Sequence, residues 1–386
     1  MSNVREIALI LSINKPYDRQ IIAGVSAYTR TVENWSLYLE DDSLEMIPDL
    51  STWQGDGVIA DFDDTRVAEA LKGLSIPIVG LGGGFRGSNP GVPNVYYDTD
   101  NEAIAKLAFD HFAERGFSRF GFCGVPQTAI NRWAQERGDC FKRVASEARF
   151  SCSVYNGRYS SPRQWRAMQK SLQRWLKTLV PPVAILACND ARARHVLEAC
   201  KRIGLRVPED VAVLGVDNDS LMCELATPQL SSVAQGTDRL GYEAAAMLDR
   251  LIDGEVHEAD RFVIPPAQVM TRHSTEVMAI DDTLISAALL YISKNACSCI
   301  QVDDVARQVR CSRSTLEKRF RAVLGRSVHA EIGRVQLRRV EELLLRSDLA
   351  LKEIAVRAGF SSVQYMATVF RKWSGVSPGQ YRALRR

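Results

Sequence analysis

The last hundred residues of this 386-residue chain take their architecture from IAVRAGFSSVQYMATVFRKWSGVSPGQYR, residues 354–382. A first helix carrying the small Ala355 ends at the tight connection AGFS (358–361), and a second helix follows, with apolar residues four and eight positions beyond its serine. A small residue lets two helices approach closely, and a serine caps the helix that follows it. The stretch therefore predicts a helix-turn-helix unit with Tyr365 and Val369 in its core.

The same pattern occurs once more, earlier in the chain. A constant offset of 49 residues pairs Ala306 with Ala355 and Leu316 with Tyr365. Between the two copies, residues 329–347 have the apolar period of one long amphipathic helix. Two helix-turn-helix units on such a rigid spacer should enter successive major grooves on one DNA face, about one helical turn apart.

Several side chains at the front of the two second helices stay exposed in this interpretation. Guanidinium, amide and carboxylate groups can read base edges in the major groove, and neighbouring Lys and Arg suit phosphates. The candidate DNA contacts are Ser312, Arg313, Ser314, Glu317, Lys318, Arg319, Ser361, Ser362, Gln364, Tyr365, Thr368, Arg371 and Lys372. For each charged residue the alternative is an ordinary solvated helix face.

Charge separates this tail from the rest of the chain. Residues 281–386 hold 19 Lys and Arg against 10 Asp and Glu, a net charge of +9, whereas the whole chain carries only +3. Residues 1–280 are therefore acidic, with a net charge of −6. Basic side chains that neutralise phosphates release condensed counterions, so the tail is expected to bind double-stranded DNA.

Composition is that of an ordinary globular protein, with 46% hydrophobic, 25% charged and 8% aromatic residues. The length suggests two or three domains. The first 15 residues have neither a membrane-spanning run nor a signal-peptide cleavage pattern, which predicts a cytoplasmic protein without membrane contact. The nine cysteines show no CxxC pair and no nearby His at zinc spacing, so we expect reduced thiols and no metal site.

Short, continuous apolar runs alternate with helical stretches through the first 280 residues. The expected strands are residues 6–13, 56–62, 77–82, 119–125, 184–188 and 211–217. Continuous apolar runs are typical of parallel strands that helices cover on both faces. One covering helix is expected over 99–116, with Asp100 as its N-cap and Gly116 at its end. The predicted fold is an α/β body of two lobes followed by an all-α domain with two helix-turn-helix units.

Polar residues follow these strands, where open α/β sheets bind their ligands. Side chains with several donors and acceptors, together with aromatic faces, suit a sugar-sized polyol. The candidate sugar ligands are Tyr17, Asp18, Arg19, Asp63, Arg132, Trp133, Arg137, Asn189, Asp190, Asp217 and Gln235. The alternative for any one of them is a helix cap or a turn residue.

The sequence offers no catalytic constellation. It has no GxSxG elbow, no HExxH and no GK[ST] phosphate loop, and its five histidines are dispersed. We therefore predict a protein that is not an enzyme, with neither catalytic residues nor cofactor. The rival hypothesis is a sugar-processing enzyme or a sugar-binding protein to which a helical interaction tail is attached.

The segment 354–382 resembles the signature of AraC/XylS-type transcription regulators, and this resemblance covers about residues 283–386. The body resembles the LacI/GalR-type periplasmic-binding-protein fold, through NKPYDRQIIAGV (14–25), GDGVIADFDD (55–64), NDARARH (189–195) and SSVAQG (231–236). One departure is Cys311, which stands at a turn position where such motifs often carry Gly.

This combined resemblance implies a transcription activator of pentose catabolic genes that D-xylose controls allosterically. It also implies a homodimer that works with RNA polymerase. Within the LacI/GalR-type fold, Asn189 and Asp190 match the polar pair after a strand, Asp217 matches the acidic residue that ends the following strand, and Gln235 matches the hinge glutamine. Arg137 matches the arginine four residues before an aromatic, here Phe141. Sensing of another pentose or polyol stays an alternative, because epimers differ by one hydroxyl.

The resemblance also sets the expected domain boundaries. The sugar-binding effector domain spans 1–275, a linker spans 276–284, and the AraC-type DNA-binding domain spans 285–386. Operator sequence, dimer interface and sign of regulation do not follow from residue chemistry.

Overall fold

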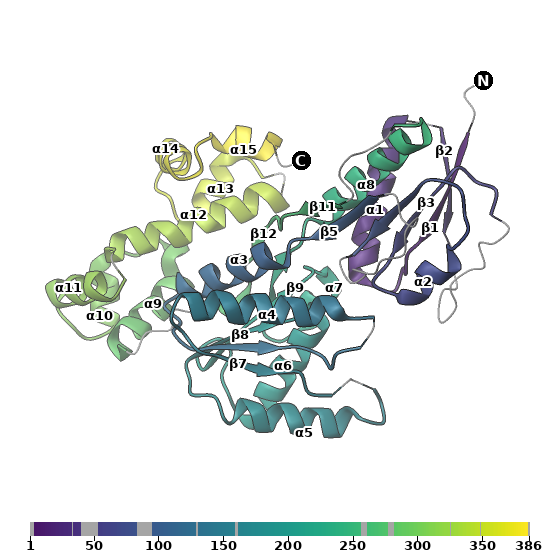
Figure 1. The fold of residues 1–386 in the computed structure, drawn as a ribbon. Coiled ribbons are helices and arrows are strands. Elements are labelled where there is room, and N and C mark those ends of the chain that lie inside the picture. The colour runs from purple at the N-terminus through teal and green to yellow at the C-terminus, as the bar shows by residue number, and fades with distance from the viewer. Residues whose placement is uncertain are drawn as a thin grey trace. The chain divides into compact units, whose positions relative to one another are not determined.

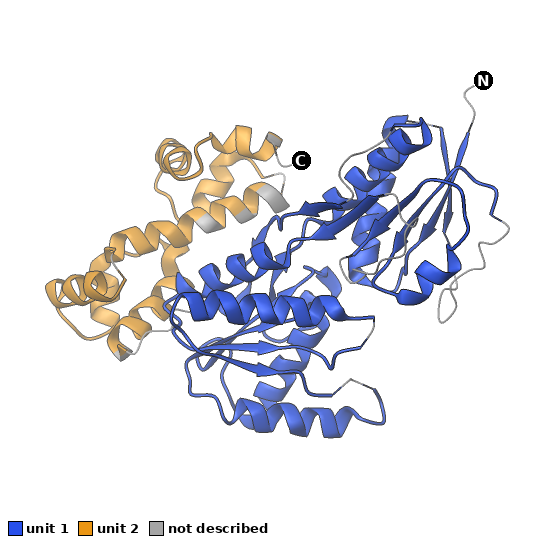
Figure 2. Cartoon of the chain, in the orientation of Figure 1, with its two compact units in different colours: residues 1–276 blue, residues 277–386 orange. Residues whose placement is uncertain are grey.

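A computed structural model describes residues 4–32, 34–39, 53–82, 95–128, 130–158, 161–255, 261–276, 282–324, 326–347 and 349–384. The chain divides into two compact units, unit 1 (1–276) and unit 2 (277–386) (Figure 2). Unit 1 combines strands and helices, whereas the described part of unit 2 is helical (Figure 1). The predicted fold class, an α/β body followed by an all-α domain, is confirmed.

The described part of unit 1 contains two six-stranded sheets, each built on a parallel core. The first sheet has the order β2-β1-β3-β4-β5-β11, and all of its pairs are parallel. Its strands are β1 (Arg5–Ile10), β2 (Trp35–Leu39), β3 (Gly57–Asp61), β4 (Ile78–Leu81), β5 (Val95–Thr99) and β11 (Arg261–Ile264). We call the part of unit 1 built on this sheet lobe 1.

The second sheet has the order β7-β6-β8-β9-β10-β12 and defines lobe 2. Its pairs are parallel except for β10 with β12. Its strands are β6 (Phe120–Cys123), β7 (Cys152–Tyr155), β8 (Val183–Ala187), β9 (Val211–Val216), β10 (Ser231–Ala234) and β12 (Gln268–Met270). Each of the six predicted strands is present within three residues of its predicted bounds. Strands β2, β5, β7, β10, β11 and β12 were not predicted, because each contains a polar residue that interrupts or shortens its apolar run.

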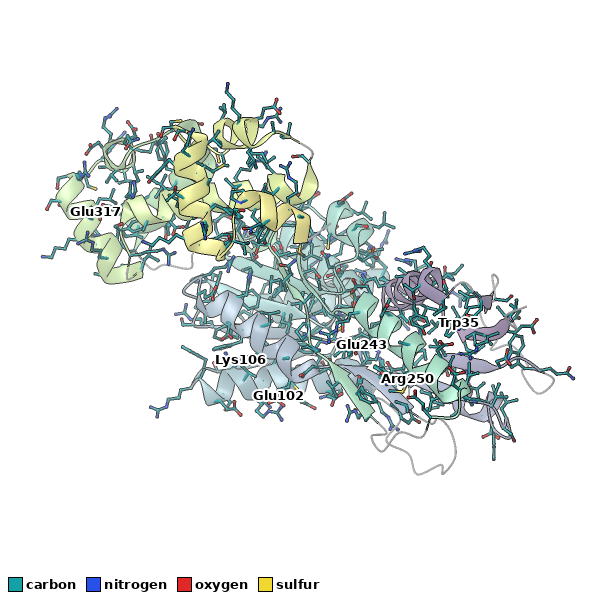
Figure 3. All side chains as sticks on the ribbon, turned by 90° about the horizontal axis from the view of Figure 1, so that it is seen from above. Trp35, Glu102, Lys106, Glu243, Arg250 and Glu317 are labelled. Atoms are coloured by element: carbon teal, nitrogen blue, oxygen red, sulfur yellow. The ribbon has the colours of Figure 1, made fainter. Side chains whose placement is uncertain are left out.

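Helices flank both sheets of unit 1 (Figure 1). They are α1 (Pro16–Val32), α2 (Thr65–Ala70), α3 (Asn101–Ala113), α4 (Arg132–Glu147), α5 (Trp165–Leu176), α6 (Asp190–Ile203), α7 (Ser220–Leu225), α8 (Thr237–Ile252) and η1 (His273–Thr275). As expected, Asp100 caps α3, accepting a hydrogen bond from the Ala103 amide at 2.8 Å, and Gly116 (φ +81°) follows its end. Glu102 and Lys106 lie on the exposed side of α3 (Figure 3).

Alternate residues of β1 explain why its sequence is continuously apolar. Ile7 and Leu9 belong to a core cluster that includes α1 and α8 side chains, whereas Ala8 and Ile10 belong to a separate cluster that includes α2 side chains. Both faces of the sheet are therefore buried, as the pattern predicted. None of the described helices is long and apolar enough to cross a membrane.

The chain passes between the lobes three times. The first passage joins β5 to α3 near Asp100, the second joins β10 to α8 through Gln235, and the third joins β11 to β12 over residues 265–267. Gln235, the predicted hinge glutamine, thus stands in one of the connections between lobes. A side chain at such a position can contact ligand-site residues and sense their movement.

Unit 2 consists, in its described part, of two small helical cores joined by one long helix. The helices are α9 (Thr283–Asn295), η2 (Ala296–Ser298), α10 (Val302–Gln308), α11 (Arg313–Leu324), α12 (Val328–Arg346), α13 (Leu351–Arg357), α14 (Val363–Ser374) and α15 (Pro378–Leu384). The long spacer helix predicted over 329–347 is α12. Of the predicted linker 276–284, residues 277–281 lie outside the described chain, and α9 already begins at Thr283.

The helix-turn-helix repeat has two registers, not the single offset of 49 that we predicted. The backbone bond from Cys311 N to Ala306 O (3.1 Å) recurs from Phe360 N to Ala355 O (2.9 Å), which preserves the offset of 49 through the first helix and turn. After the turn the offset becomes 50. The reason is that the second turn, AGFSS, contains one more residue than VRCS.

This insertion overturns the predicted core of the second unit. Leu316 and Phe320 are fully buried as expected, and their counterparts are Met366 and Phe370, also fully buried. The predicted core residue Tyr365 is instead 50% exposed, and the side chain of Val369 is only partly buried. One extra residue rotates the helix by about 100°, which is enough to move a neighbour into the core.

The capping and turn residues shift with the register. Ser312 Oγ accepts from the Thr315 amide at 3.1 Å, and Ser362 Oγ, not the predicted Ser361, accepts from the Tyr365 amide at 3.2 Å. The left-handed turn residue is Arg310 (φ +54°) in the first unit and Gly359 (φ +78°) in the second. Cys311 therefore does not occupy the glycine position, and its side chain joins the first core.

Candidate effector and DNA-binding sites

The predicted sugar ligands in lobe 2 meet around one buried arginine. Arg137, in α4, is 2% exposed. It donates from Nε to Asn101 Oδ1 (3.0 Å), from Nη1 to the Cys188 carbonyl (2.6 Å) and from Nη2 to Gln235 Oε1 (2.9 Å). Its guanidinium carbon lies 5.2 Å from the centre of the Trp133 ring. One side chain thus contacts a strand end of lobe 2 and side chains at two interlobe passages.

Gln235 extends this network to the next strand end. Its Nε2 donates to Asp217 Oδ1 at 2.6 Å. Burial raises the pKa of Asp217 to about 7, and Asp219 adds to this, while Arg137 and Gln235 oppose it. Asp217 also adopts φ +110°, an unusual conformation for a residue other than glycine. We call Asn101, Arg137, Gln235 and Asp217 the hinge network.

Asn189 and Asp190 follow β8 and hold the neighbouring loop. Asp190 is fully buried; Oδ1 accepts from Ser232 Oγ (2.6 Å) and Oδ2 from the Asp219 amide (2.8 Å). Burial and the nearby Asp217 raise its pKa well above the ordinary value. Asn189 caps α6 with its side-chain oxygen. Asp190 thereby positions the loop after β9, and its contact with a sugar stays a prediction.

In lobe 1, the predicted ligands lie among several carboxylates. Asp18 is fully buried; its Oδ2 accepts from the Ser12 amide at 2.7 Å, while its Oδ1 has no partner among the described residues. Burial and Asp61 raise the pKa of Asp18 to about 7, whereas Lys15 lowers it. Lys15 Nζ itself lies 2.6 Å from Asp61 Oδ2. An unsatisfied buried carboxylate oxygen is well suited to accept from a ligand hydroxyl.

Tyr17 shares these surroundings. Burial raises the pKa of its hydroxyl well above the ordinary value, and Asp63, then Asp98, add to the effect. Tyr17 also influences the pKa of Arg137, which burial lowers. Its phenol is therefore near enough to the lobe 1 carboxylates and to Arg137 to influence their electrostatics.

Two hydrogen bonds join the lobes beside this site. Gln20 Nε2 donates to the Asp217 carbonyl at 2.8 Å, and Arg19 Nη2 donates to Asp219 Oδ2 at 3.4 Å. Gln20 also bonds the hydroxyl of Thr237, the first residue of α8. Arg19, predicted as a sugar ligand, is thus engaged with the opposite lobe.

One predicted ligand lies outside this assembly, and three of its members were not predicted. Arg132 begins α4 and is exposed, and none of the contacts above includes it. The missed members are Asn101, Asp98 and Gln20. Asn101 and Asp98 flank the first passage between lobes. Asp98 was missed because the strand β5 was not predicted, and Asn101 was missed because its partner Arg137 lies 36 positions away in the chain.

In the first helix-turn-helix unit, several predicted DNA contacts already have partners. Arg313 Nη1 lies 3.1 Å from Asp303 Oδ2. Arg319 donates to Asp282 Oδ2 from Nε at 2.8 Å, and its Nη2 lies 2.7 Å from the same oxygen. Glu317 is partly buried, and its Oε2 lies 3.8 Å from Arg321 Nε. Ser312, Ser314 and Lys318 are exposed.

The second unit presents its predicted DNA contacts more openly. All of its predicted contacts are exposed: Ser361, Ser362, Gln364, Tyr365, Thr368, Arg371 and Lys372. Thr368 Oγ1 donates to the backbone carbonyl of Gln364 at 2.9 Å, a bond that does not involve the Gln364 side-chain amide. Among the described residues, neither Arg371 nor Lys372 forms an ion pair. This surface combines one amide, one aromatic ring and two cations, the groups that suit base edges and phosphates.

A two-lobed α/β body with polar strand ends, joined to paired helix-turn-helix units, defines the class: a ligand-responsive, DNA-binding transcription regulator. Family models agree with it along the chain. A periplasmic binding protein-like domain matches residues 109–275, a XylR N-terminal domain matches 6–102, and a helix-turn-helix domain matches 305–384.

Individual relatives identify the family within this class of transcription regulators. The xylose operon regulatory protein of Escherichia coli K12 is 40% identical over 97% of this chain and 96% of its own length. That of Haemophilus influenzae is 35% identical over 98% of both chains. A solved structure of the xylose-binding transcription activator XylR is 38% identical, covers 99% of both chains and superposes with a TM-score of 0.68. The chain belongs to the family of xylose operon regulatory proteins.

Proposed function

We propose that this regulator activates pentose catabolic genes in response to D-xylose, bound by unit 1 at the carboxyl ends of its strands. The observation that carries the proposal is the near full-length similarity to xylose operon regulatory proteins, which includes both the effector unit and the DNA-binding unit. The protein acts in the cytoplasm, without a cofactor and without catalysis, as a homodimer that works with RNA polymerase.

The residues assigned to the sugar supply matched donors and acceptors. Asp18 Oδ1 is a buried acceptor without a described partner, and Asp217 is a second acidic acceptor. Asn189 and Arg137 donate, and Tyr17 and Trp133 supply aromatic faces. Asp63 completes the acceptors of lobe 1. Arg19 belongs to the interlobe contacts. Arg132, whose side chain is exposed, remains a candidate sugar ligand.

The hinge network suggests how sugar binding could change the arrangement of the two lobes. A hydroxyl bound by Asp217 acts on a carboxyl that Gln235 holds directly. Gln235 stands in an interlobe passage, so its position depends on how the lobes are arranged. A ligand shifts such an equilibrium only by its differential affinity for the two arrangements, typically about 1 to 3 kcal/mol of coupling. DNA must then tighten sugar binding by the same factor.

DNA binding is assigned to the exposed faces of α11 and α14. Base edges are read by Arg313, Ser314, Glu317, Gln364, Tyr365 and Thr368, and phosphates are held by Ser312, Ser361, Ser362, Lys318, Arg319, Arg371 and Lys372. The effector domain ends near residue 275, and the DNA-binding domain begins after a linker over 276–284.

The test is a titration of promoter DNA with the purified protein, with and without D-xylose, at two salt concentrations. L-arabinose and D-ribose serve as controls. The proposal expects tightening by D-xylose alone and a steep loss of affinity with salt, since phosphate contacts dominate binding. DNA binding that responds to another pentose would transfer the same architecture to that sugar. No DNA binding would favour the enzyme or sugar-binding-protein hypothesis.

A further inference from the structure

Lobe 2 contains a second buried arginine that the hinge network does not use. Arg192, in the first turn of α6, is 2% exposed. Its Nη1 donates to the Arg158 carbonyl at 3.2 Å. Its Nε and Nη2 are buried and have no hydrogen-bond partner among the described residues. Two guanidinium nitrogens left open in this way can donate to a pair of oxygens.

Tyr155, the last residue of β7, lies against the same guanidinium. The Arg192 guanidinium carbon is 5.6 Å from the centre of the Tyr155 ring. The Tyr155 hydroxyl is buried and likewise has no partner in the described chain. Its ring stacks on Trp175 with centroids 5.3 Å apart, which holds it in place. Three unsatisfied N–H and O–H groups therefore come from two neighbouring side chains.

No described carboxylate balances the charge of Arg192. Its neighbours include the Cys123 thiol, which its side chain contacts, the Cys188 thiol and the His195 imidazole, and the pKa of both thiols is raised by burial. Burial lowers the pKa of His195 to about 4, and Arg192 with Arg194 adds to the effect, so this imidazole stays neutral. A buried cation without a counterion is strongly unfavourable, whereas an oxyanion bound to it recovers much of that free energy.

The backbone of Arg192 lies next to a predicted sugar ligand. Its backbone amide donates to Asn189 Oδ1 at 2.9 Å, one helical turn away. Arg192 and Arg137 both act on the pKa of the Cys188 thiol, which burial raises to about 12. Arg192 therefore belongs to the same sheet edge as Arg137 and Asn189.

We propose that Arg192 and Tyr155 form an oxyanion subsite beside the pentose site, and that it takes the carboxylate or phosphate of an acidic pentose derivative. The Nε–H and Nη2–H groups donate to two oxygens of the anion, and the Tyr155 hydroxyl donates to one of them. The inference rests on the proposed function, since it extends the range of effectors that unit 1 recognises.

Calorimetric titration of the full-length protein tests this proposal with three sugars. D-xylose is neutral, D-xylonate carries a carboxylate and D-xylose 5-phosphate carries a phosphate. At low salt we expect one acidic sugar to bind about tenfold more tightly than D-xylose, equivalent to about 1.4 kcal/mol. Salt should reduce this advantage. Competition by inorganic phosphate or by acetate then identifies which anion the subsite takes.

Variants of Arg192 and Tyr155 test whether these two side chains cause the preference for the acidic sugar. Arg192→Met should abolish the preference for the acidic sugar, Arg192→Lys should keep part of it, and Tyr155→Phe should reduce it less. Arg202→Met is the matched control, because Arg202 is on the same helix, exposed and paired with Glu198 at 2.7 Å. The control should bind all three sugars as the wild type does.

Two results would overturn the subsite: equal wild-type affinity for neutral and acidic sugars, and an unchanged preference in Arg192→Met. If Arg192→Met does not fold, the wild-type ranking together with Tyr155→Phe decides the question. A failure of the proposed function is different in kind, because then none of the three sugars would bind.

Discussion

The two helix-turn-helix units of unit 2 share one core pattern but differ in what surrounds their second helices. Leu316 and Phe320 in the first unit correspond to Met366 and Phe370 in the second, and all four are buried. The exposed faces differ more. Arg313 and Arg319 of α11 form ion pairs, whereas Arg371 and Lys372 of α14 have none among the described residues.

The partner of Arg319 is informative because of its place in the chain. Asp282 caps α9 and lies at the beginning of the described part of unit 2, within the predicted linker 276–284. A side chain of the predicted linker therefore contacts the second helix of the first unit. The second helix of the first unit is thus joined by an ion pair to the start of α9.

The largest expected effect concerns the two cores. Phe320→Ala and Phe370→Ala should each destabilise unit 2 by about 3–5 kcal/mol, because each leaves a cavity in a well-packed site. The two phenylalanines lie in separate clusters, so each variant should disturb mainly its own helix-turn-helix unit. Amide hydrogen exchange of the full-length protein measures this. Equal loss of protection in both units would show that they form one cooperative core.

The next effect concerns DNA recognition. Gln364→Ala should cost about 1–3 kcal/mol of binding and relax preference at one base pair, whereas Lys372→Ala should weaken all sequences alike. Arg313→Ala should cost less than Gln364→Ala, because Arg313 must first leave Asp303. Competition binding with single-base operator variants measures all three. A larger specific loss from Arg313→Ala would make the first unit the principal reader.

The turn residues allow a sharper comparison. Gly359→Ala should destabilise the second unit by about 1–2 kcal/mol or more, because its φ is +78° and an added Cβ would lie 2.7 Å from the Cys297 carbonyl oxygen. Arg310→Gly should instead stabilise the first unit by up to about 1 kcal/mol, since Arg310 already has φ +54°. Thermal unfolding of both variants measures the difference. Shifts of the same sign would contradict this account.

The smallest effect concerns the ion pair between Asp282, in the predicted linker, and Arg319 of α11. Asp282→Asn should keep the α9 cap and weaken the ion pair with Arg319, at a cost of at most about 1 kcal/mol because Arg319 is exposed. If this contact connects the linker to the first unit, D-xylose should change DNA affinity less in the variant. Arg321→Gln, which alters a longer contact on α11, is the control. An unchanged sugar response would limit the contact to a structural role.

Much of this architecture follows from local pattern. The period of residues 329–347 corresponds to α12, Asp100 caps α3, and the continuous apolar run of β1 is buried on both faces. These features were predictable because each depends on neighbouring residues and on burial of one helix stripe or one strand. The resemblance to sugar-responsive regulators was also visible in short segments.

Other features needed distant residues. The offset change from 49 to 50 was invisible in the sequence, because serines at 361 and 362 offer equivalent caps and only packing selects Met366 over Tyr365. Asn101 was missed as a member of the hinge network because its bond to Arg137 joins residues 36 positions apart.

The amino-acid sequence by itself therefore determined the class of fold, the two-part organisation and the kind of side chain available at each strand end. Tertiary structure alone decided which polar groups satisfy one another and which do not. Both carboxylate oxygens of Asp190 accept hydrogen bonds, one from Ser232 Oγ and one from the Asp219 amide, whereas Nε and Nη2 of Arg192 have no hydrogen-bond partner among the described residues. The physical reason is that hydrogen bonding in a buried site depends on distances between elements far apart in the chain, which local propensity does not specify.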